Sequence, residues 1–316
     1  KRVQSIFFIG KSQNLCYNDT EGENQMKSYL QKAYCMNQTV RIYAAITTDL
    51  ANEAMSIHHL WPTSAAALSR VLTIAAIMSC TYKAGEYLNI NIRGNGPVCP
   101  ITVEATDGKV RGFVHNPGVY LKDRSGKIVV KDGVGNDGLI EVIKDLHLRE
   151  PFSSTSQLIS GEIAEDFTYY FAQSEQIPSA VGLGESFNSD ASITACGGFL
   201  FQIMPGCSDE SITKLEQKLK NLKSCAKMIE EGYTAIDIIR EITDGDYQLL
   251  ETKELSYCCP CSKSRFRNSL KLLGQEELKD ILKTDHHASI TCQFCGSRYE
   301  FDETELTEML NELKAN

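Results

Sequence analysis

Alternating apolar and polar residues predict β-strands through much of the first two thirds of the chain. Apolar side chains occupy every second position in residues 88–93 and again in residues 101–104, which is the spacing of a strand with one solvated face. The pair Asp107-Gly108 that follows is typical of a two-residue hairpin turn. Residues 39–46 and 197–204 predict further strands. The pattern as a whole predicts a sheet-rich N-terminal domain.

Helical spacing is found in two segments. Residues 52–82 predict one long, mostly buried helix, because apolar residues crowd its second half. Residues 207–250 predict a helical connector, in which Ser208 is a favourable N-cap, Gly232 ends a first helix and Thr234 begins a second. The connector has two interpretations. It is either a fixed spacer or a marginally stable segment that stays folded only while both flanking domains hold it.

The predicted fold class is therefore α+β, with the chain divided into four segments. An N-terminal extension covers residues 1–26, a sheet-and-helix core residues 27–206, the helical linker residues 207–250 and a small C-terminal domain residues 251–316. A chain of 316 residues is long enough for two domains, since domains usually contain about 100–200 residues. The extension is polar, and an organelle-targeting remnant is one interpretation of it.

Composition and charge narrow the function classes. The chain is 42% hydrophobic and 23% charged, as in an ordinary soluble protein, and no apolar run reaches the roughly 20 residues of a membrane span. A formal net charge of −9 and a pI near 5.3 disfavour a general nucleic-acid binder, which carries a basic face. No Ser, His and acid set stands out, and we interpret His58, His115 and His147 as structural, so no enzyme is predicted.

Residues 133–138 match the G-x-G-x-x-G spacing of a dinucleotide-binding loop. Such a loop must follow a strand and open a helix whose N-terminus faces the pyrophosphate. Residues 139–143 alternate like another strand instead. A plain turn is the favoured interpretation, and no nucleotide site is predicted.

Four cysteines near the C-terminus give the strongest chemical signal. Cys259 and Cys261 form a C-x-C pair, Cys292 and Cys295 form a C-x-x-C pair, and residues 262–291 separate the two. Two close thiol pairs joined by a long insert are what a tetrahedral Zn²⁺ site of four thiolates requires. Spacing alone leaves Cys258 as an alternative to Cys259, because Cys258 and Cys261 also make a C-x-x-C.

The quartet has a structural and a redox interpretation. It is either a structural zinc ribbon or a switch, since thiolates that lose their metal become reactive and each pair is close enough to form a disulfide. His286 and His287 are not needed to complete the ligand set. The remaining thiols are scattered, as expected for buried cysteines in a reducing compartment. They are Cys16, Cys35, Cys80, Cys99, Cys196, Cys207 and Cys225.

Two other function classes compete with these interpretations. A zinc-ribbon module would contact nucleic acid or a partner protein through a small basic cluster. That cluster is Lys263, Arg265, Arg267 and Lys271. A thiol-disulfide oxidoreductase would use Cys292 and Cys295, but it needs a thioredoxin-like βαβ setting that the sequence around Thr291 lacks.

Short motifs follow one another in a fixed order along most of the chain. They include Thr47-Thr48-Asp49, Trp61-Pro62-Thr63, Gly94-Asn95-Gly96-Pro97, Asn116-Pro117, Ser160-Gly161-Glu162 and Gly197-Gly198-Phe199. With the C-x-C and C-x-x-C pairs, these motifs resemble the heat shock protein 33 family, also called 33 kDa chaperonins, over residues 30–305. The family pattern selects Cys259 over Cys258. Ser69 departs from it, because the family usually has Gly there.

The resemblance implies a redox-regulated, ATP-independent holdase chaperone of the stress response. In such a protein one Zn²⁺ per chain is held in the reduced state, here by the four cysteines of a zinc-binding redox-switch domain. Oxidation then forms the disulfides Cys259–Cys261 and Cys292–Cys295 and expels the zinc. Unfolded client proteins bind, the oxidised protein forms a homodimer, and clients pass to an ATP-dependent foldase. A cytoplasmic location is implied, or an organelle matrix if residues 1–26 are a targeting remnant.

Overall fold

The computed structural model describes residues 28–315, which form two compact units, residues 28–257 and residues 258–315. The predicted extension over residues 1–26, and Cys16 with it, lies outside the described residues. Both units contain runs of strands and runs of helices, which confirms the predicted α+β class.

Two sheets form the framework of the larger unit. One has five strands in the order β10-β1-β2-β9-β8, and the other has six in the order β11-β5-β4-β3-β6-β7. All pairings are antiparallel except that of β11 with β5. The first sheet contains β1 (Tyr29–Cys35), β2 (Val40–Ile46), β8 (Ser179–Phe187), β9 (Ile193–Ile203) and β10 (Gln248–Glu254). The second contains β3 (Tyr87–Gly94), β4 (Ile101–Thr106), β5 (Lys109–Val114), β6 (Gly138–Asp145), β7 (Phe152–Gln157) and β11 (Ser256–Tyr257).

The predicted strands and hairpin are confirmed. Strand β2 lies within residues 39–46, and β9 contains most of residues 197–204. In the β4–β5 hairpin, Thr106 pairs with Lys109. Asp107 and Gly108 between them both have positive φ, at 54° and 81°, as a tight two-residue turn of this hand requires.

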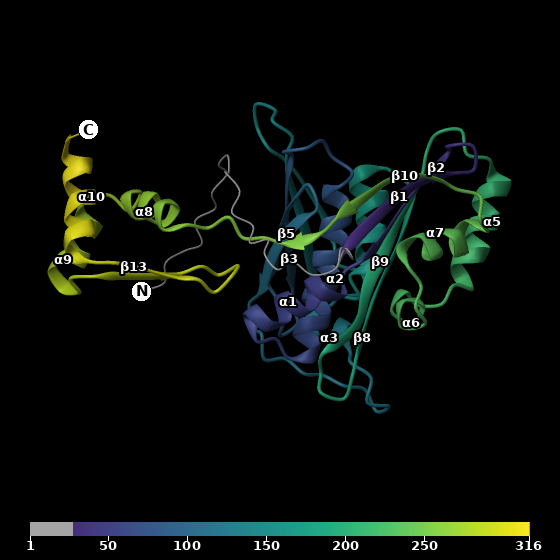
Figure 1. Ribbon diagram of the computed structural model, residues 1–316, viewed down its shortest axis with the longest axis horizontal. Helices are drawn as coiled ribbons and strands as arrows, with labels where there is room; N and C mark the ends of the chain where they lie inside the picture. Colours follow the sequence, from purple (N-terminus) through teal and green to yellow (C-terminus); the bar gives the residue numbers. More distant parts are fainter. Residues whose placement is uncertain (1–27, 316) are drawn as a thin grey trace, which may run out of the picture. The chain divides into compact units, whose positions relative to one another are not determined.

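Helices α1 (Thr48–His58) and α2 (Pro62–Ser79) lie between the sheets (Figure 1). The prediction of one helix over residues 52–82 is wrong, because His59 turns left-handed with φ of 50° and Pro62 starts a new helix at a position where its missing N–H is not needed. Every residue of α2 except Arg70 is buried. The helix is long and apolar enough to cross a membrane, but 94% of that stretch is buried inside the fold, which identifies it as a core helix.

The five-stranded sheet is apolar on both faces. Tyr43 and Ala45 of β2 belong to the core around α2, and the alternate residues point to the opposite face. Apolar residues of that second face are Val40, Ile42, Ala44, Phe199 and Phe201. Three short helices cover it, α5 (Asp209–Lys220), α6 (Cys225–Glu230) and α7 (Ala235–Thr243) (Figure 1).

The predicted start at Ser208, end at Gly232 and restart at Thr234 are confirmed, but the first predicted helix is two helices, α5 and α6, separated by residues 221–224. The Ser211 backbone N–H donates to Ser208 Oγ at 3.2 Å at the start of α5. Gly232 has φ of 88° after α6, and Thr234 with Asp237 forms a capping box at the start of α7. The connector is helical as far as Thr243, but residues 248–250 belong to β10.

Residues 251–257 also differ from the prediction, which placed them in the C-terminal domain. Strand β10 pairs with β1, and β11 pairs with β5, so these residues are hydrogen-bonded into both sheets of the larger unit. The smaller unit therefore begins at Cys258.

The glycine-rich residues 133–138 are a turn between α3 (Val130–Val134) and β6, as predicted. The Gly96 N–H donates to the Val134 carbonyl at 2.9 Å, and the Val98 N–H donates to that of Gly133 at 2.9 Å. A Cβ on Gly135 would lie 1.9 Å from the side-chain oxygen of Asn95. These glycines serve close backbone packing, and a strand follows them instead of a helix.

Helix α4 (Ala164–Tyr170) and a π-helical turn, Phe171–Glu175, complete the larger unit. The smaller unit has three helices and one hairpin. They are α8 (Lys263–Lys271), α9 (Gln275–Thr284), β12 (Ala288–Thr291), β13 (Arg298–Phe301) and α10 (Glu303–Ala315). Its core is small and lies between the helices and the hairpin. It consists of Leu270, Leu278, Phe301, Leu306, Met309 and Leu310.

Candidate metal centre

The turn of the β12–β13 hairpin positions Cys292 and Cys295. The Cys292 N–H donates to the Ser297 carbonyl at 2.9 Å, and the Gly296 N–H donates back to the Cys292 carbonyl at 2.9 Å. Gly296 has φ of 72°, a left-handed conformation that glycine adopts without strain. This tight turn brings both thiols of the C-x-x-C pair to one side of the hairpin end.

The C-x-C pair lies just before α8. Ser262 begins that helix, and its side chain accepts a hydrogen bond from the Arg265 N–H at 3.3 Å. The cap fixes where the helix starts, so Cys259 and Cys261 are held in an extended segment immediately ahead of it.

The four sulfurs converge. Sγ of Cys259 lies 3.7 Å from that of Cys292, and Sγ of Cys261 lies 3.3 Å from that of Cys295. All four lie within 4.8 Å of one another. A tetrahedral site with metal–sulfur bonds of about 2.3 Å has sulfur–sulfur edges of about 3.8 Å, so the donor set fits one metal ion of the zinc type.

Electrostatics supports the same conclusion. Neighbouring thiols, Cys259 first, raise the pKa of Cys261 to about 11, and Cys259 and Cys261 also raise the pKa of Cys292. Four negative sulfurs so close together repel one another, whereas a divalent cation among them would favour the thiolates. The cluster has the chemistry of a cation site.

Two hydroxyl groups that the sequence analysis did not identify contact the cluster. Tyr299 Oη lies 3.2 Å from Cys261 Sγ, and Ser297 Oγ lies 3.3 Å from Cys295 Sγ. The Tyr299 ring packs against Phe266 with ring centroids 5.1 Å apart. Both hydroxyls follow the last cysteine within four residues, and that proximity is the only signal that could have found them.

The other candidate ligands lie outside this group. The group contains Cys259 and not Cys258. His286 Nδ1 lies 3.5 Å from a Glu303 oxygen, and His287 Nδ1 lies 2.7 Å from the Asp285 carbonyl oxygen. Within residues 28–315, no second group of three or more Cys, His or acidic side chains has a comparable geometry.

The basic cluster of the smaller unit is largely neutralised. Lys263 pairs with Glu305 at 2.7 Å, and Arg267 pairs with Glu312 at 2.6 Å. Lys271 also forms an ion pair with Glu312. Arg267 and Lys271 lower the pKa of Glu312 to about 2. Carboxylates of α10 thus form ion pairs with the cations that would have to contact nucleic acid, which argues against the nucleic-acid interpretation.

Most of the scattered thiols are buried, as predicted. Burial raises the pKa of Cys35, Cys196 and Cys225 to about 12 and that of Cys80 to about 11. Cys99 is also buried, whereas Cys207 is half-buried. At neutral pH the five buried groups are protonated thiols that pack like small apolar side chains.

The fold and the four-cysteine site define the class: an α+β protein with a candidate metal centre in a separate C-terminal unit. The family model of the Hsp33 protein matches residues 28–302. The 33 kDa chaperonin of Staphylococcus haemolyticus is 42% identical over 290 residues, which is 91% of this chain and 99% of that protein. The 33 kDa chaperonin of Bacillus subtilis is 41% identical over 280 residues, covering 88% and 96%.

A solved structure agrees with these relatives. The crystal structure of the 33 kDa chaperonin (heat shock protein 33 homolog) of Thermotoga maritima matches with a TM-score of 0.85 and 33% identity, covering 92% of this chain and 100% of that one. The chain belongs to the Hsp33 protein family and is a chaperone of the Hsp33 type.

Proposed function

We propose that this chaperone is a redox-regulated, ATP-independent holdase. Cys259, Cys261, Cys292 and Cys295 hold one Zn²⁺ per chain in the reduced state, and oxidation to disulfides activates the protein. The observation that carries the proposal is the convergence of these four sulfurs within 4.8 Å in a unit with a small core. Zinc, when bound, cross-links the two cysteine pairs and keeps the thiolates from reacting.

The redox step uses peroxide as the oxidant. Two thiolates and one hydrogen peroxide give one disulfide and two hydroxide ions, with one electron leaving each sulfur as the O–O bond breaks. Following the family, the pairs are Cys259–Cys261 and Cys292–Cys295. Oxidation of both pairs removes all four ligands, so the metal is released. Reduction restores the thiolates and the resting state.

Loss of the metal is expected to unfold the smaller unit. The core of a unit of this size seldom contributes more than about 3–5 kcal/mol, and structural zinc contributes on the order of 10–16 kcal/mol in small zinc-finger peptides. The buried core of six apolar residues does not replace that contribution.

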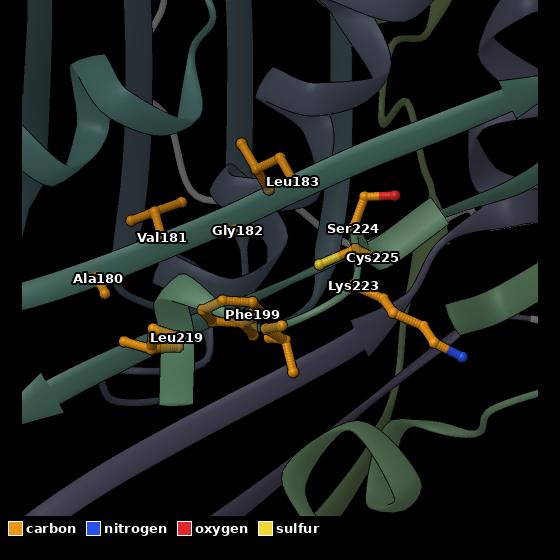
Figure 2. A pocket seen from close by; sticks show the side chains of 10 residues that line it. Ala180, Val181, Gly182, Leu183, Phe199, Leu219, Lys223, Ser224 and Cys225 are labelled. Carbon is orange, nitrogen blue, oxygen red and sulfur yellow. The ribbon is translucent and has the colours of Figure 1, made fainter. Parts of the chain in front are cut away.

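The consequence for the larger unit concerns α5, α6 and α7. These helices cover the second face of the five-stranded sheet incompletely. A groove of about 260 Å³ remains beside Phe199, lined by Val181 and Leu183 of β8 and by Leu219 and Cys225 of the linker (Figure 2). Helices seated over an open groove, with charged outer faces, have low local stability. We propose that they detach on oxidation and expose the apolar face to clients.

The chain itself connects the two events. Tyr257, the last residue of β11, precedes Cys259 by two positions. Its hydroxyl donates to the Gly112 carbonyl at 2.9 Å and lies 2.9 Å from His58 Nε2. In the sequence, strand β10 lies between α7, the last linker helix, and β11. Unfolding after Cys258 would therefore pull first on this short strand and then on the linker.

The remaining expectations follow from this activity. The exposed face binds unfolded client proteins by burying their apolar groups, without ATP and without catalytic turnover. The oxidised protein forms a homodimer and passes clients to an ATP-dependent foldase after reduction. We place it in the cytoplasm, or in an organelle matrix if residues 1–26 are a targeting remnant.

Light scattering from a heat-unfolding client tests the proposal. Reduced, zinc-loaded protein should leave aggregation unchanged, and peroxide-treated protein should suppress it while releasing about one zinc per chain. Cys207→Ser is the control for Cys259→Ser, because Cys207 is a half-buried free thiol that lies outside the four-sulfur group. The control should retain its zinc, and Cys259→Ser should lose most of it. Zinc retained under peroxide, or equal inactivity in both states, would contradict the proposal.

A further inference from the structure

The hydroxyl group of Tyr299 makes a contact with the metal centre that the proposed switch has not used. Its oxygen lies 3.2 Å from Cys261 Sγ, within hydrogen-bond distance for sulfur. Tyr299 lies in β13, where it pairs with Ile290, and its ring packs against Phe266 of α8. A strand and an aromatic contact thus fix the phenol, so the distance to the sulfur is set by the fold and not by a mobile side chain.

Chemistry sets the direction of this hydrogen bond. A metal-bound cysteine is a thiolate, which can only accept, whereas a phenol with an ordinary pKa near 10 keeps its proton at neutral pH and can donate. A donor directed at a thiolate withdraws electron density from the sulfur lone pairs. This both stabilises the thiolate as a ligand and weakens it as a nucleophile toward peroxide.

The hydroxyl contact of the second pair differs. Cys295 Sγ donates to Ser297 Oγ at 3.3 Å, and Ser297 lies in the exposed turn of the hairpin. A serine hydroxyl is less acidic than a phenol, and an exposed hydroxyl also exchanges with water. Hydrogen bonding therefore restrains the Cys261 sulfur more strongly than the Cys295 sulfur.

We propose that Tyr299 is a positioning residue that donates a hydrogen bond to the Cys261 thiolate and so slows its oxidation. The inference rests on the proposed zinc-bound switch and adds a residue that sets its threshold. In the restrained step, the thiolate attacks peroxide to give a sulfenic acid and hydroxide. The Cys259 thiolate then displaces a second hydroxide to form the disulfide. Tyr299 acts on the first attack, because it competes for the sulfur lone pair.

Tyr299→Phe tests the inference, since it removes the oxygen and keeps the ring on Phe266. Residues that hydrogen-bond to metal ligands typically change metal affinity by about 10- to 100-fold, so zinc affinity in competition with a chelator should fall by about tenfold. The rate at which peroxide oxidises the Cys259 and Cys261 pair should rise by about three- to tenfold, the equivalent of one hydrogen bond. Ser297→Ala is the matched control and should change the first pair by less than about twofold.

A spectroscopic readout separates this role from a merely structural one. With Co²⁺ in place of zinc, loss of a donor to sulfur should move the sulfur-to-metal charge-transfer band of Tyr299→Phe to longer wavelength, while its melting temperature stays near that of the unmodified protein. Unchanged zinc affinity, oxidation rate and band position would overturn the inference and leave the switch intact. If the unmodified protein itself releases no zinc under peroxide, the proposed function fails instead.

Discussion

Two sets of helices cover opposite faces of one sheet, and they differ in how firmly they are held. Helix α2 is buried along its whole length except at Arg70, which is held by ion pairs with Glu162 and Glu185 at 2.7 and 2.8 Å. On the other face, α5 buries only Leu215, and the interface includes an open groove. Both faces of the sheet are apolar, so the apolar character of the sheet does not explain why α2 is held more firmly than α5–α7.

The two sets of helices differ in what covers the side that faces away from the sheet. Helix α2 is enclosed by both sheets, so its detachment would unfold the larger unit. Helices α5, α6 and α7 have water on their outer sides, and their detachment leaves the sheet paired. Local opening takes the lowest free-energy route, so α5–α7 should open first. Under the proposed function, the face beneath α2 stays covered and the face beneath α5–α7 is uncovered on oxidation.

Removal of the metal should give the largest difference in stability between α5–α7 and α2. Cys292→Ser deletes one of the four sulfurs, and structural zinc is worth on the order of 10–16 kcal/mol in small zinc-finger peptides. We expect loss of zinc, unfolding of residues 258–315 and exposure of the face beneath α5–α7 in reducing buffer, with α2 unaffected. Chelator-based zinc assay and amide exchange measure these changes. A variant that still binds one zinc tightly would contradict the four-ligand assignment.

Paired truncations test the two faces directly. Leu72→Ala in α2 should lower the free energy of global unfolding by about 2–5 kcal/mol, because a buried leucine leaves a cavity. Leu215→Ala in α5 should leave global unfolding nearly unchanged and increase binding of an apolar dye to the reduced protein. Urea unfolding and dye fluorescence give the two readouts. Equal losses of global stability would mean that the linker and the core unfold as one unit.

A glycine in β8 allows a cleaner test of the linker face. The three heavy atoms nearest to a Cβ on Gly184 would all belong to Ala226 of α6, the backbone nitrogen being nearest at 3.1 Å. Gly184→Val should push α6 off the sheet, at a cost of about 1–3 kcal/mol, and give holdase activity without peroxide while zinc stays bound. Gly118→Val is the control, since a Cβ there meets only the Asn116 side chain at 3.7 Å. Inactivity of the Gly184 variant would place the client surface elsewhere.

Alkaline pH should weaken the docking of α5, α6 and α7 on the five-stranded sheet. Burial raises the pKa of Cys35 and Cys225 from 9.0 to about 12 while the linker is docked. A raised pKa stabilises the docked state fully below pH 9, and this contribution is lost as pH rises from 9 to 12, by up to about 1.4 kcal/mol per pH unit for each thiol. Dye binding by the reduced protein should increase over that range. The Cys35→Ala and Cys225→Ala double variant should show a shallower increase, and an identical slope would contradict this cause.

The smallest expected effect concerns the strand between linker and metal centre. Tyr257→Phe removes the hydroxyl that contacts Gly112 and His58, and one net hydrogen bond is worth about 0.5–1.5 kcal/mol. We expect less peroxide to be needed for half-activation, measured by client light scattering. Tyr247→Phe is the matched control, because the Tyr247 hydroxyl has only an exposed contact of 3.4 Å with Arg240. Equal thresholds in both variants would exclude β11 as the connecting element.

Features with local causes could be predicted from the sequence. The hairpin at Asp107, the cap at Ser208 and the two cysteine pairs each depend on residues within a few positions, and all four thiols of those pairs meet in the structure. The choice of Cys259 over Cys258 came from the family resemblance and not from spacing. Most of the scattered thiols were expected to be buried, and Cys35, Cys80, Cys99, Cys196 and Cys225 are.

Features with distant causes were missed. Strand β10 has no alternating pattern, because most of its residues are exposed. It pairs at the sheet edge with β1, where Tyr34 meets Gln248 and Tyr29 meets Glu254, 214 and 225 positions apart in the sequence. The contacts of Tyr257 and Tyr299 likewise join segments that only the folded chain brings together. The break at His59 is an exception, because Pro62 is a local signal for a new helix that the prediction of one helix overlooked.

Amide hydrogen exchange before and after peroxide tests the central claim most directly. The account predicts that backbone amides of α5, α6 and α7 exchange at least about tenfold faster once both disulfides have formed, while amides of α2 keep their protection. Reduction with zinc should restore the original rates. Unchanged protection of α5–α7 in fully oxidised protein that suppresses client aggregation would contradict the claim that this face of the sheet is the one uncovered.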